Sequence, residues 1–390
     1  MTAHPHDEPI AGDADDAVGG MAQLLAARLE RLAALRADGL DPYPPRARRS
    51  HTTAEARAAF TALESAGQAE GPADVFLCGR LVGAIRRMGG SMFVHLQDQA
   101  GSLQLHLRRD RMGEAAFQQA ADRFDPGDFV QAEGTVFRTR AGEVSLAVDR
   151  WTMLAKSLRP LPEKWHGLTD VETRLRQRYL DLLANADVRE RFVRRSLIVR
   201  AMRNFLDGRG FLEVETPTLQ PIYGGGAARP FETHYHALDQ RMYLRIADEL
   251  YLKRCLVGGL ERVYEICKDF RNEGIDRTHM PEFTMMECYW AYADYHDVMR
   301  LVEEMVAAIA VEVNGAPEAH LPDGTRLDLR PPWRRWTVRD AILDTTGIDV
   351  GVVDTLPALR QAIDERSLAV ASQPTWAKTV DELVSDYVEP

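Results

Sequence analysis

The stretch from Phe270 to Tyr295, FRNEGIDRTHMPEFTMMECYWAYADY, most constrains the fold of this 390-residue chain. An apolar run ends at Arg271 and Glu273, and a polar loop follows as far as Pro281. A second run of bulky residues then extends from Glu282 to Trp290. Two such runs on either side of a polar loop predict a pair of β-strands.

One face of the second strand carries groups that suggest chemistry. Because side chains alternate along a strand, this face presents Phe283, Met285, Glu287 and Tyr289. At about 3.3 Å per residue, Phe283 and Glu287 are ~13 Å apart. That separation suits a nucleoside stacked on the ring and an amine bound to the carboxylate. The alternative is a core hairpin with solvated polar groups, which accounts for Met285 but poorly for Glu287 and Tyr289.

The composition argues against several classes of protein. A net charge of −11 does not suit sequence-independent coating of nucleic acid, which needs a broadly basic surface. No run of about eighteen apolar residues predicts a membrane span, and the acidic N-terminus lacks the apolar core of a secretory signal. The four cysteines form no CxxC pair, so we expect neither a zinc site nor disulfides, and a cytoplasmic location.

The N-terminal part predicts a tail followed by helices. Residues 1–20 have the composition of an acidic disordered tail. Leucines at helical spacing predict a helix over Met21–Ala37, and a second helix is expected from Thr53 to about Ser65. We therefore expect N-terminal helices over residues 21–70.

From Val75 the hydrophobic period changes to that of strands. Five short alternating runs are separated by Gly-containing turns, and a helical stretch over Met112–Phe124 follows the third run. This order predicts an OB-fold β-barrel over residues 71–157, a fold that binds oligonucleotides on the face of its second and third strands.

Phe93 and Gln104 fall on those two strands. An aromatic ring that stacks on a base and an amide that reads a base edge suit single-stranded RNA. The alternative is that Phe93 belongs to the core and Gln104 is merely solvated.

Strands and helices are mixed in the C-terminal half. A proline-containing linker is expected over residues 158–180, and Thr169–Leu206 is helical and rich in arginine. The glycine loop GGGAARPF at 224–231 permits close approach of the backbone to a ligand. Further elements are expected as strands at 211–217, 243–246 and 326–329 and as helices at 247–257, 296–313, 337–345, 356–365 and 375–387.

The chain from about Leu24 onward resembles the class II lysyl-tRNA synthetases, through the barrel and the segments GFLEVETP, GGGAARPF, FRNEG and PEFTMMECYWAYADY. The resemblance implies an α+β fold in which an OB-fold anticodon-binding barrel precedes a class II antiparallel-sheet catalytic domain over residues 181–390. It implies a homodimeric, cytoplasmic lysine–tRNA ligase, with ATP, L-lysine and tRNA(Lys) as substrates and lysyl-adenylate as intermediate.

The resemblance also implies roles for single residues. Arg271 matches the catalytic arginine that binds the ATP α-phosphate and the lysine carboxylate. The other ATP-binding positions are Glu273, His279 and Phe283, with Phe283 stacked on adenine. The lysine-binding positions are Gly225 and Glu249 for the α-amino group, and Glu287 and Tyr289 for the ε-amino group. The anticodon-binding positions are Arg86, Phe93, Gln104 and Glu143, and Pro217 is implied to contact the second subunit.

The resemblance stops before motif 3, the last signature of the class II enzymes. The carboxylates that hold Mg²⁺ in the family are therefore not expected among these residues, and no lysine-dependent ATP–pyrophosphate exchange is expected from this chain. Two interpretations stay open: an incomplete sequence of a lysine–tRNA ligase, or a catalytically inactive, tRNA-binding synthetase-like protein. A protein that lysylates another protein is a third, against which the barrel counts.

Overall fold

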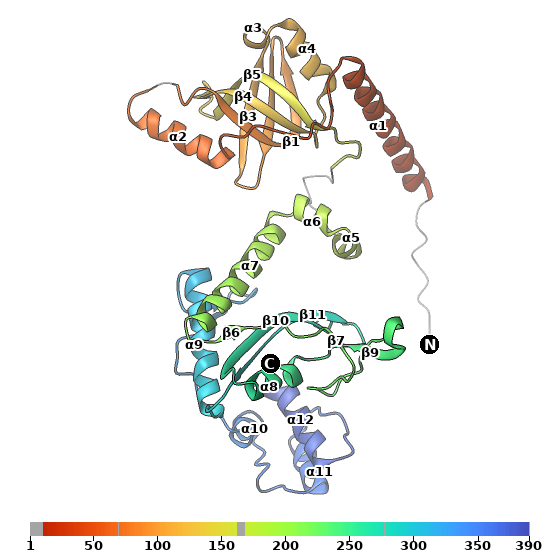
Figure 1. The fold of residues 1–390 in the computed structure, drawn as a ribbon, viewed down its shortest axis with the longest axis vertical. Coiled ribbons are helices and arrows are strands. Elements are labelled where there is room, and N and C mark those ends of the chain that lie inside the picture. Colours follow the sequence, from red (N-terminus) through yellow and green to blue (C-terminus); the bar gives the residue numbers. More distant parts are fainter. Residues whose placement is uncertain (1–10, 69, 162–167, 277, 390) are drawn as a thin grey trace. The chain divides into compact units, whose positions relative to one another are not determined.

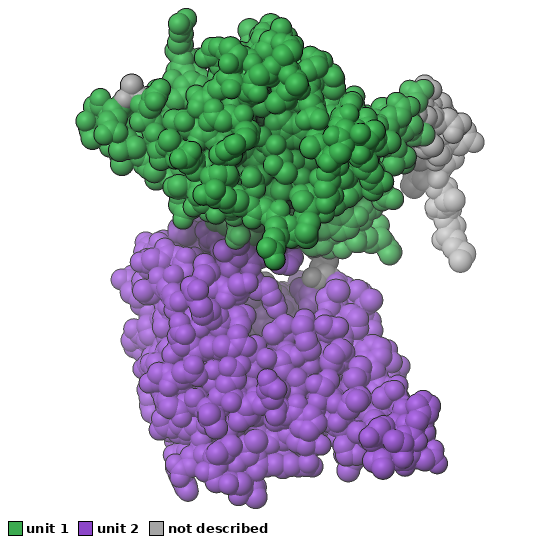
Figure 2. Space-filling view, turned by 45° about the horizontal axis from the view of Figure 1, so that its top comes forward, with its two compact units in different colours: residues 1–190 green, residues 191–390 purple. Residues whose placement is uncertain are grey.

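The structure, a computed structural model, describes residues 11–68, 70–161, 168–276 and 278–389, with the backbone alone for 11–19. The chain divides into two compact units, Met1–Glu190 and Arg191–Pro390 (Figure 2). Across the described residues, every helix falls short of the length and apolarity that a bilayer span requires.

A five-stranded barrel forms the centre of the first unit (Figure 1). The strands pair in the order β1-β2-β3-β5-β4, and β4 pairs again with β1, which closes the sheet. The strands are β1 (Val75–Met88), β2 (Ser91–Gln97), β3 (Ser102–Arg108), β4 (Phe129–Arg138) and β5 (Val144–Ala155). The expected OB-fold barrel is thereby confirmed.

The barrel interior follows directly from the alternation of the sequence. β2 and β3 each bury every second residue. The buried set on these strands is Met92, Val94, Leu96, Leu103, Leu105 and Leu107. The intervening residues, Phe93 and Gln104 among them, therefore belong to the outer surface.

Helices cover parts of the barrel. The helical stretch expected over Met112–Phe124 is two helices, α3 (Arg109–Met112) and α4 (Glu114–Arg123). They are separated by Gly113, whose φ of +83° is left-handed. The helix α2 (Thr53–Ser65) has the expected bounds and begins at a capping box of Thr52 and Glu55.

The first helix differs from the expectation. α1 (Ala11–Ala37) begins ten residues earlier than Met21, so the proposed disordered tail is wrong over 11–20, and residues 1–10 lie outside the described part. Alanine and aspartate, which suggested disorder, also suit the first turns of a helix.

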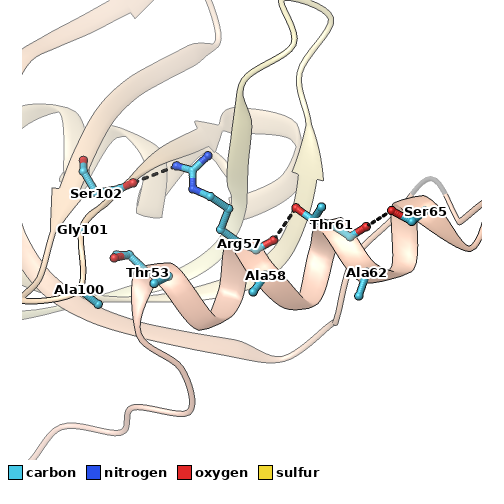
Figure 3. Close-up of a pocket in the computed structure, with 10 residues that line it drawn as sticks. Thr53, Arg57, Ala58, Thr61, Ala62, Ser65, Ala100, Gly101 and Ser102 are labelled. Carbon is cyan, nitrogen blue, oxygen red and sulfur yellow. Dashed lines mark hydrogen bonds between the residues drawn. The ribbon is translucent and has the colours of Figure 1, made fainter. Parts of the chain in front are cut away.

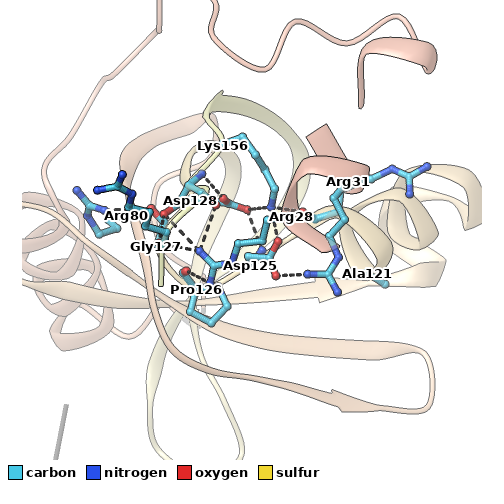
Figure 4. A network of polar contacts seen from close by, with 12 residues as sticks. Arg28, Arg31, Arg80, Ala121, Asp125, Pro126, Gly127, Asp128 and Lys156 are labelled. Carbon is cyan, nitrogen blue, oxygen red and sulfur yellow. Dashed lines mark hydrogen bonds and ion pairs between the residues drawn. The ribbon is translucent and has the colours of Figure 1, made fainter. Parts of the chain in front are cut away.

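A buried polar network joins α1 to the barrel (Figure 4). The buried Arg28 donates to the carbonyl oxygens of Ser157 at 3.1 Å and Arg159 at 2.9 Å. Close by, Lys156 pairs with Asp128 at 2.8 Å and with Asp125. Burial raises the pKa of Asp128, and Lys156 partly offsets that effect.

The expected linker over 158–180 contains helical residues. α5 (Val171–Arg176) lies within the linker, and Asp170 caps this helix by accepting from the Thr173 amide. The next helix, α6 (Arg178–Ala184), also begins within the linker. The part at 162–167 lies outside the described residues. The long helical segment is thus divided into α5, α6 and α7 (Ala186–Asp207).

The second unit contains the strand pair that the sequence predicted. β10 (Arg262–Phe270) and β11 (Glu282–Trp290) run antiparallel, and β6 (Leu212–Glu213) joins β10 in parallel. One face of this sheet packs on α7 and on α9 (Tyr295–Asn314) (Figure 1). Tyr264 is fully buried there, with Phe205, Leu206, Phe211, Leu301 and Met305. The opposite face remains for polar side chains.

The other elements of this unit include short strands that the sequence did not indicate. The segment expected as a strand at 211–217 pairs over only two residues, since the polar Thr216 and Pro217 leave the ladder. A second sheet has the order β7-β9-β8, from β7 (Leu219–Gln220), β8 (Glu232–Tyr235) and β9 (Gln240–Leu244). The helix α8 (Glu249–Val257) follows β9.

The last part of the described chain is a small helical cluster. The hairpin of β12 (Glu318–His320) and β13 (Arg326–Asp328) precedes it. The helices α10 (Val338–Thr346), α11 (Leu356–Glu365) and α12 (Trp376–Tyr387) share one apolar core. Their bounds agree with the expected helices to within one residue.

Candidate functional site

The face of β10–β11 turned away from α7 and α9 carries the candidate site. Opposite residues in the register share a face, and the pairs are Val263 with Tyr289, Glu265 with Glu287, Cys267 with Met285, and Asp269 with Phe283. The strands and the shared face of Phe283, Glu287 and Tyr289 were predicted from alternation. The polar residues of β10 on the same face, Glu265, Cys267 and Asp269, were not singled out, although the same alternation marks them.

A cavity of about 490 Å³ lies at the Phe283 end of the two strands, and its lining takes residues from both faces together with Arg195 of α7. Its lining includes all four residues expected to bind ATP, and the full lining set is Arg195, Lys268, Arg271, Glu273, Gly274, Thr278, His279, Met280, Glu282, Phe283 and Thr284. The guanidinium carbon of Arg271 lies 5.1 Å from the centre of the Phe283 ring. The Nε atom of Arg271 is buried and, among the described residues, has no hydrogen-bond partner. A buried N–H group without an acceptor suits a position where a ligand supplies the acceptor.

The loop between the strands is held by its own polar groups. Asp276 accepts from the backbone of Thr278 at 2.7 Å and contacts Nδ1 of His279 at 2.7 Å. The Thr278 amide and the His279 ring lower the pKa of Asp276 to about 2. Glu273 accepts from the Arg229 amide at 3.3 Å, which ties the loop to the glycine segment.

Glu287 is the central residue at the opposite end of the β10–β11 face from Phe283. The residue is half-buried, and burial, followed by the charge of Asp269, raises the pKa of its carboxyl. Two donors reach this carboxylate, the backbone amide of Asp248 and the hydroxyl of Tyr289. Tyr289 therefore donates to Glu287, and burial and that carboxylate raise the pKa of its phenol.

Gly225 and Glu249 lie against each other. Gly225 has a φ of +89°, and a Cβ atom there would be 2.8 Å from the Cβ of Glu249 and 3.0 Å from that of Ala247. The position therefore requires glycine. Glu249 pairs with Lys253 at 2.6 Å, and its charge also raises the pKa of Glu287. All four expected lysine-binding residues thus belong to one neighbourhood.

A buried acidic cluster adjoins Glu287. The Sγ atom of Cys267 lies 2.9 and 3.0 Å from the two carboxylate oxygens of Asp248 and 3.7 Å from Oδ1 of Asp269. Arg245 pairs with Glu265 at 2.7 Å and lies 3.3 Å from Asp269 and 3.7 Å from Asp248. Spacing in the sequence gave no indication of this cluster, because two separate segments, 245–248 and 265–269, contribute to it.

The residues that the structure describes do not form a magnesium site. Among the described residues, the group that could surround a metal ion is Asp248, Cys267 and Asp269. Mg²⁺ requires octahedral oxygen ligands, whereas this group offers a thiol and lies beside the guanidinium of Arg245. In the cavity beside Arg271, the carboxylate of Glu282 already pairs with the ammonium group of Lys268 at 3.4 Å. No catalytic step is therefore assigned to Mg²⁺.

On the barrel, Phe93 lies on the outer surface and is half-buried. Its ring stacks on His106 at a centroid distance of 4.3 Å and an interplanar angle of 12°, and His106 in turn stacks on Phe137 at 5.8 Å. The alternative that Phe93 is a core residue is therefore wrong, because Met92 and Val94 occupy the interior. His106, directly opposite Phe93 in the register, could have been found by the same alternation.

Gln104 takes part in a polar network rather than being merely solvated. Its amide nitrogen donates to Glu143 at 2.8 Å, and its oxygen accepts from Ser145 at 2.9 Å. Glu143 also bonds to Nε2 of His95 at 2.9 Å. Arg86 is exposed and lies opposite Phe93 across β1 and β2, so the structure brings all four expected anticodon-binding residues to one surface.

Another cavity, of about 610 Å³, lies between α2 and the turn from β2 to β3 (Figure 3). Small side chains line it, and Arg57 is the charged residue among the described lining. The guanidinium of Arg57 donates to the Ser102 carbonyl oxygen at 3.0 Å. Its described lining offers no group suited to catalysis.

Pro217 lies on an exposed stretch between β6 and β7. Its carbonyl oxygen accepts from the side chain of Gln220 at 3.0 Å. Large apolar side chains are exposed on the same stretch and on α7, namely Phe192, Ile198, Leu212, Leu219 and Ile222.

Comparison with known proteins adds two family matches. Residues 170–376 match the family described as tRNA synthetases class II (D, K and N), and residues 75–154 match the OB-fold nucleic acid binding domain.

Curated relatives bear the name lysine–tRNA ligase. The relative from Roseiflexus castenholzii is 54% identical over 368 residues, which cover 94% of this chain and 74% of the relative. The relative from Chloroflexus aurantiacus is 54% identical over 367 residues, with the same coverage of both chains. The relative from Moorella thermoacetica is 50% identical over 367 residues, which cover 94% of this chain and 73% of the relative.

Proposed function

Because this chain belongs to the class II lysyl-tRNA synthetases, we propose that it joins L-lysine to tRNA(Lys) in an ATP-dependent reaction that passes through lysyl-adenylate. The observation that carries the proposal is one strand face with Arg271 and Phe283 at one end and Glu287 and Tyr289 at the other.

Glu287 supports the choice of lysine over other amino acids. Among the described residues its half-buried carboxylate has hydrogen-bond donors but no ion-pair partner, and it therefore suits the ε-ammonium group. A neutral or acidic side chain in the same place would leave this carboxylate unpaired, at a cost of several kcal/mol. Tyr289 orients the carboxylate, and Glu249 and Gly225 adjoin it for the α-amino group.

The first chemical step is attack of a lysine carboxylate oxygen on the α-phosphorus of ATP. The new oxygen–phosphorus bond forms as the bond to pyrophosphate breaks, and pyrophosphate leaves. Negative charge accumulates between the two anions, and Arg271 neutralises it and aligns both partners. Phe283 stacks on adenine, and Glu273 and His279 border the same cavity. No nucleophilic side chain or general base is required.

In the second step, a terminal hydroxyl of tRNA(Lys) attacks the carbonyl carbon of lysyl-adenylate and releases AMP. The barrel supplies recognition of the anticodon. Phe93 stacks on a base, Gln104 and Glu143 read base edges, and the exposed Arg86 contacts the backbone. His106 holds the Phe93 ring in its orientation.

A homodimer in the cytoplasm completes the proposal. The exposed apolar side chains on α7 and around Pro217 suit a contact with a second copy of the chain. The cysteines of the chain form no CxxC pair, and this sequence feature suits a reducing compartment.

Calorimetric titration with L-lysine and with ATP tests this function. In the Glu287→Gln variant, lysine affinity falls at least about 100-fold while ATP affinity stays as in the parent, since only the ammonium partner is lost. Glu304→Gln, an exposed glutamate that pairs with Arg209, is the matched control. Unchanged lysine affinity in Glu287→Gln contradicts the assignment.

Lysine-dependent ATP–pyrophosphate exchange separates the ligase from the remaining candidate. Exchange by the purified chain supports lysine activation. Binding of tRNA(Lys) without exchange instead supports the inactive tRNA-binding protein.

A further inference from the structure

Asp248 and Asp269, here called the acidic pair, lie next to Glu287 and have no role in the chemistry above. Both residues are fully buried. Asp248 precedes the first residue of α8, and Asp269 is the penultimate residue of β10. The thiol of Cys267 lies between them, 2.9 Å from Asp248 and 3.7 Å from Asp269.

The charges around the acidic pair do not balance. From the loop after β9 comes one buried guanidinium, Arg245, and it already pairs with the buried Glu265 of β10 at 2.7 Å. The other titratable or charged groups on the packed elements are Glu249 and Lys253 of α8, Cys267 of β10, Arg271, and Glu287 and Tyr289 of β11. Lys253 is exposed and pairs with Glu249. Burial raises the pKa values of Cys267 and Tyr289, so the thiol and the phenol stay neutral.

Among the described residues, one buried cation, Arg245, thus faces the three buried carboxyls of Glu265, Asp248 and Asp269. Holding an uncompensated carboxylate away from water costs several kcal/mol, which a bound proton avoids. Burial raises the pKa of Asp248 to about 7 and also raises that of Asp269. In addition, Oδ2 of Asp269 is buried without a hydrogen-bond partner among the described residues.

The acidic pair is coupled to Glu287 through one hydrogen bond and one charge–charge interaction. The backbone amide of Asp248 donates to the Glu287 carboxylate, and the charge of Asp269 disfavours ionisation of Glu287. An ammonium group bound to Glu287 has the opposite effect, because its positive charge favours the ionised forms of Glu287, Asp248 and Asp269.

From these contacts we propose that the acidic pair holds one proton while the lysine site is empty and releases it to solvent when the lysine ammonium binds, so that lysine affinity rises with pH. This inference rests on the proposed function of Glu287. Asp248 and Asp269 are positioning residues, because they act through Glu287 rather than through contact with lysine. A metal ion is the less suitable occupant, because Arg245 lies 3.3 Å from Asp269.

The sign of the effect follows from linkage. Below pH 7 the acidic pair keeps its proton, and ammonium binding must displace it, which weakens binding. Above pH 7 the proton is already lost and affinity reaches a plateau. One proton linked in this way changes the dissociation constant about tenfold between pH 6 and pH 8.

Calorimetric titration of L-lysine into the purified 390-residue chain at pH 6, 7 and 8, in phosphate and in Tris, tests the inference. We expect affinity to rise up to about tenfold across this range. The binding enthalpy differs between the two buffers near pH 7, because the released proton is taken up by the buffer. Asp248→Asn and Asp269→Asn bind lysine with little pH dependence, whereas Asp328→Asn, an exposed aspartate that pairs with Arg330, behaves as the parent.

The outcomes separate the two proposals. Lysine binding that is flat from pH 6 to pH 8, with no buffer dependence, overturns the acidic-pair inference alone. No lysine binding at any pH overturns the proposed function and this inference with it. Stoichiometric zinc in the purified chain, with pH dependence that disappears on chelation, overturns the proton in favour of a metal. The buffer comparison uses the parent protein, so it decides the matter even if a variant fails to fold.

Discussion

Glu265 and Glu287 face each other across β10 and β11, yet among the described residues Glu265 alone of the two has a buried cation, the guanidinium of Arg245 at 2.7 Å. Two carboxylates on neighbouring strands repel each other unless each has a partner. Arg245 therefore supports the fold beneath Glu265, and Glu287 is left for a ligand. This asymmetry is the observation from which we propose Glu287 as the partner of an ammonium group.

Removal of Arg245 tests its structural role. Arg245→Met leaves Glu265, Asp248 and Asp269 without their shared cation, and we expect the free energy of unfolding to fall by about 3–5 kcal/mol. Arg330→Met, which breaks an exposed pair with Asp328, changes it by less than about 1 kcal/mol. Urea unfolding of both variants at pH 7.5 provides the comparison. Equal, small effects would show that the buried cation is dispensable.

The glycine loop provides a second test. Gly225→Ala introduces a Cβ atom 2.8 Å from Glu249 in a left-handed conformation, and we expect lysine binding to weaken by about tenfold. Gly226→Ala is a close control, because no atom lies within 4 Å of its added Cβ. Calorimetric titration with lysine measures both. If the two variants bind lysine equally well, the contact between Gly225 and Glu249 has no part in the site.

The barrel surface can be tested apart from catalysis. Phe93→Ala removes the ring that stacks on His106, and we expect binding of tRNA(Lys) to weaken by about 1–3 kcal/mol at fixed salt. Lysine and ATP binding should be unaffected. Phe129→Ala, on β4 beside Arg80, is an aromatic control on the same barrel. Filter binding with a tRNA(Lys) transcript distinguishes them, and a larger loss for Phe129→Ala would argue for a different RNA surface.

The acidic pair also predicts how stability depends on pH. The pKa of Asp248 is raised from 3.8 to about 7, so between these values the folded chain binds more protons than the unfolded chain. Its contribution to stability is present at low pH and is lost as pH rises toward 7. Asp248→Asn has no carboxyl to ionise at this position. We therefore expect its free energy of unfolding to rise by about 2 kcal/mol relative to that of the parent as pH increases from 5 to 8.

Urea unfolding of the parent and of Asp248→Asn at pH 5, 6, 7 and 8 measures that difference. The prediction concerns how the difference between the two proteins changes with pH, which cancels groups that titrate in both. A difference that stays constant with pH would mean that Asp248 keeps the same charge throughout.

Several features could be predicted from the sequence because they depend on short-range periodicity. Alternation gave the five barrel strands, the β10–β11 pair and the shared face of Phe283 and Glu287. The helix α2 and the helices near the end of the described chain were also expected from the sequence. Strands of two to four residues, such as β7, β8 and β12, were missed, since so few residues carry no periodicity. The start of α1 was missed because alanine and aspartate suit both a helix and a disordered tail.

The sequence by itself determined the family resemblance, the order of the elements and the side chains that share the face of β11. Only the tertiary structure decided which of those side chains have partners. Phe93 acquired His106 from β3, Gln104 acquired Glu143 from the turn before β5, and Tyr289 proved to donate to Glu287. The acidic pair depends on segments at 245–249 and 265–269 that meet only when α8 packs on β10. The burial of a residue and the charges around it depend on groups from such distant segments, so the spacing of residues along one strand cannot reveal either.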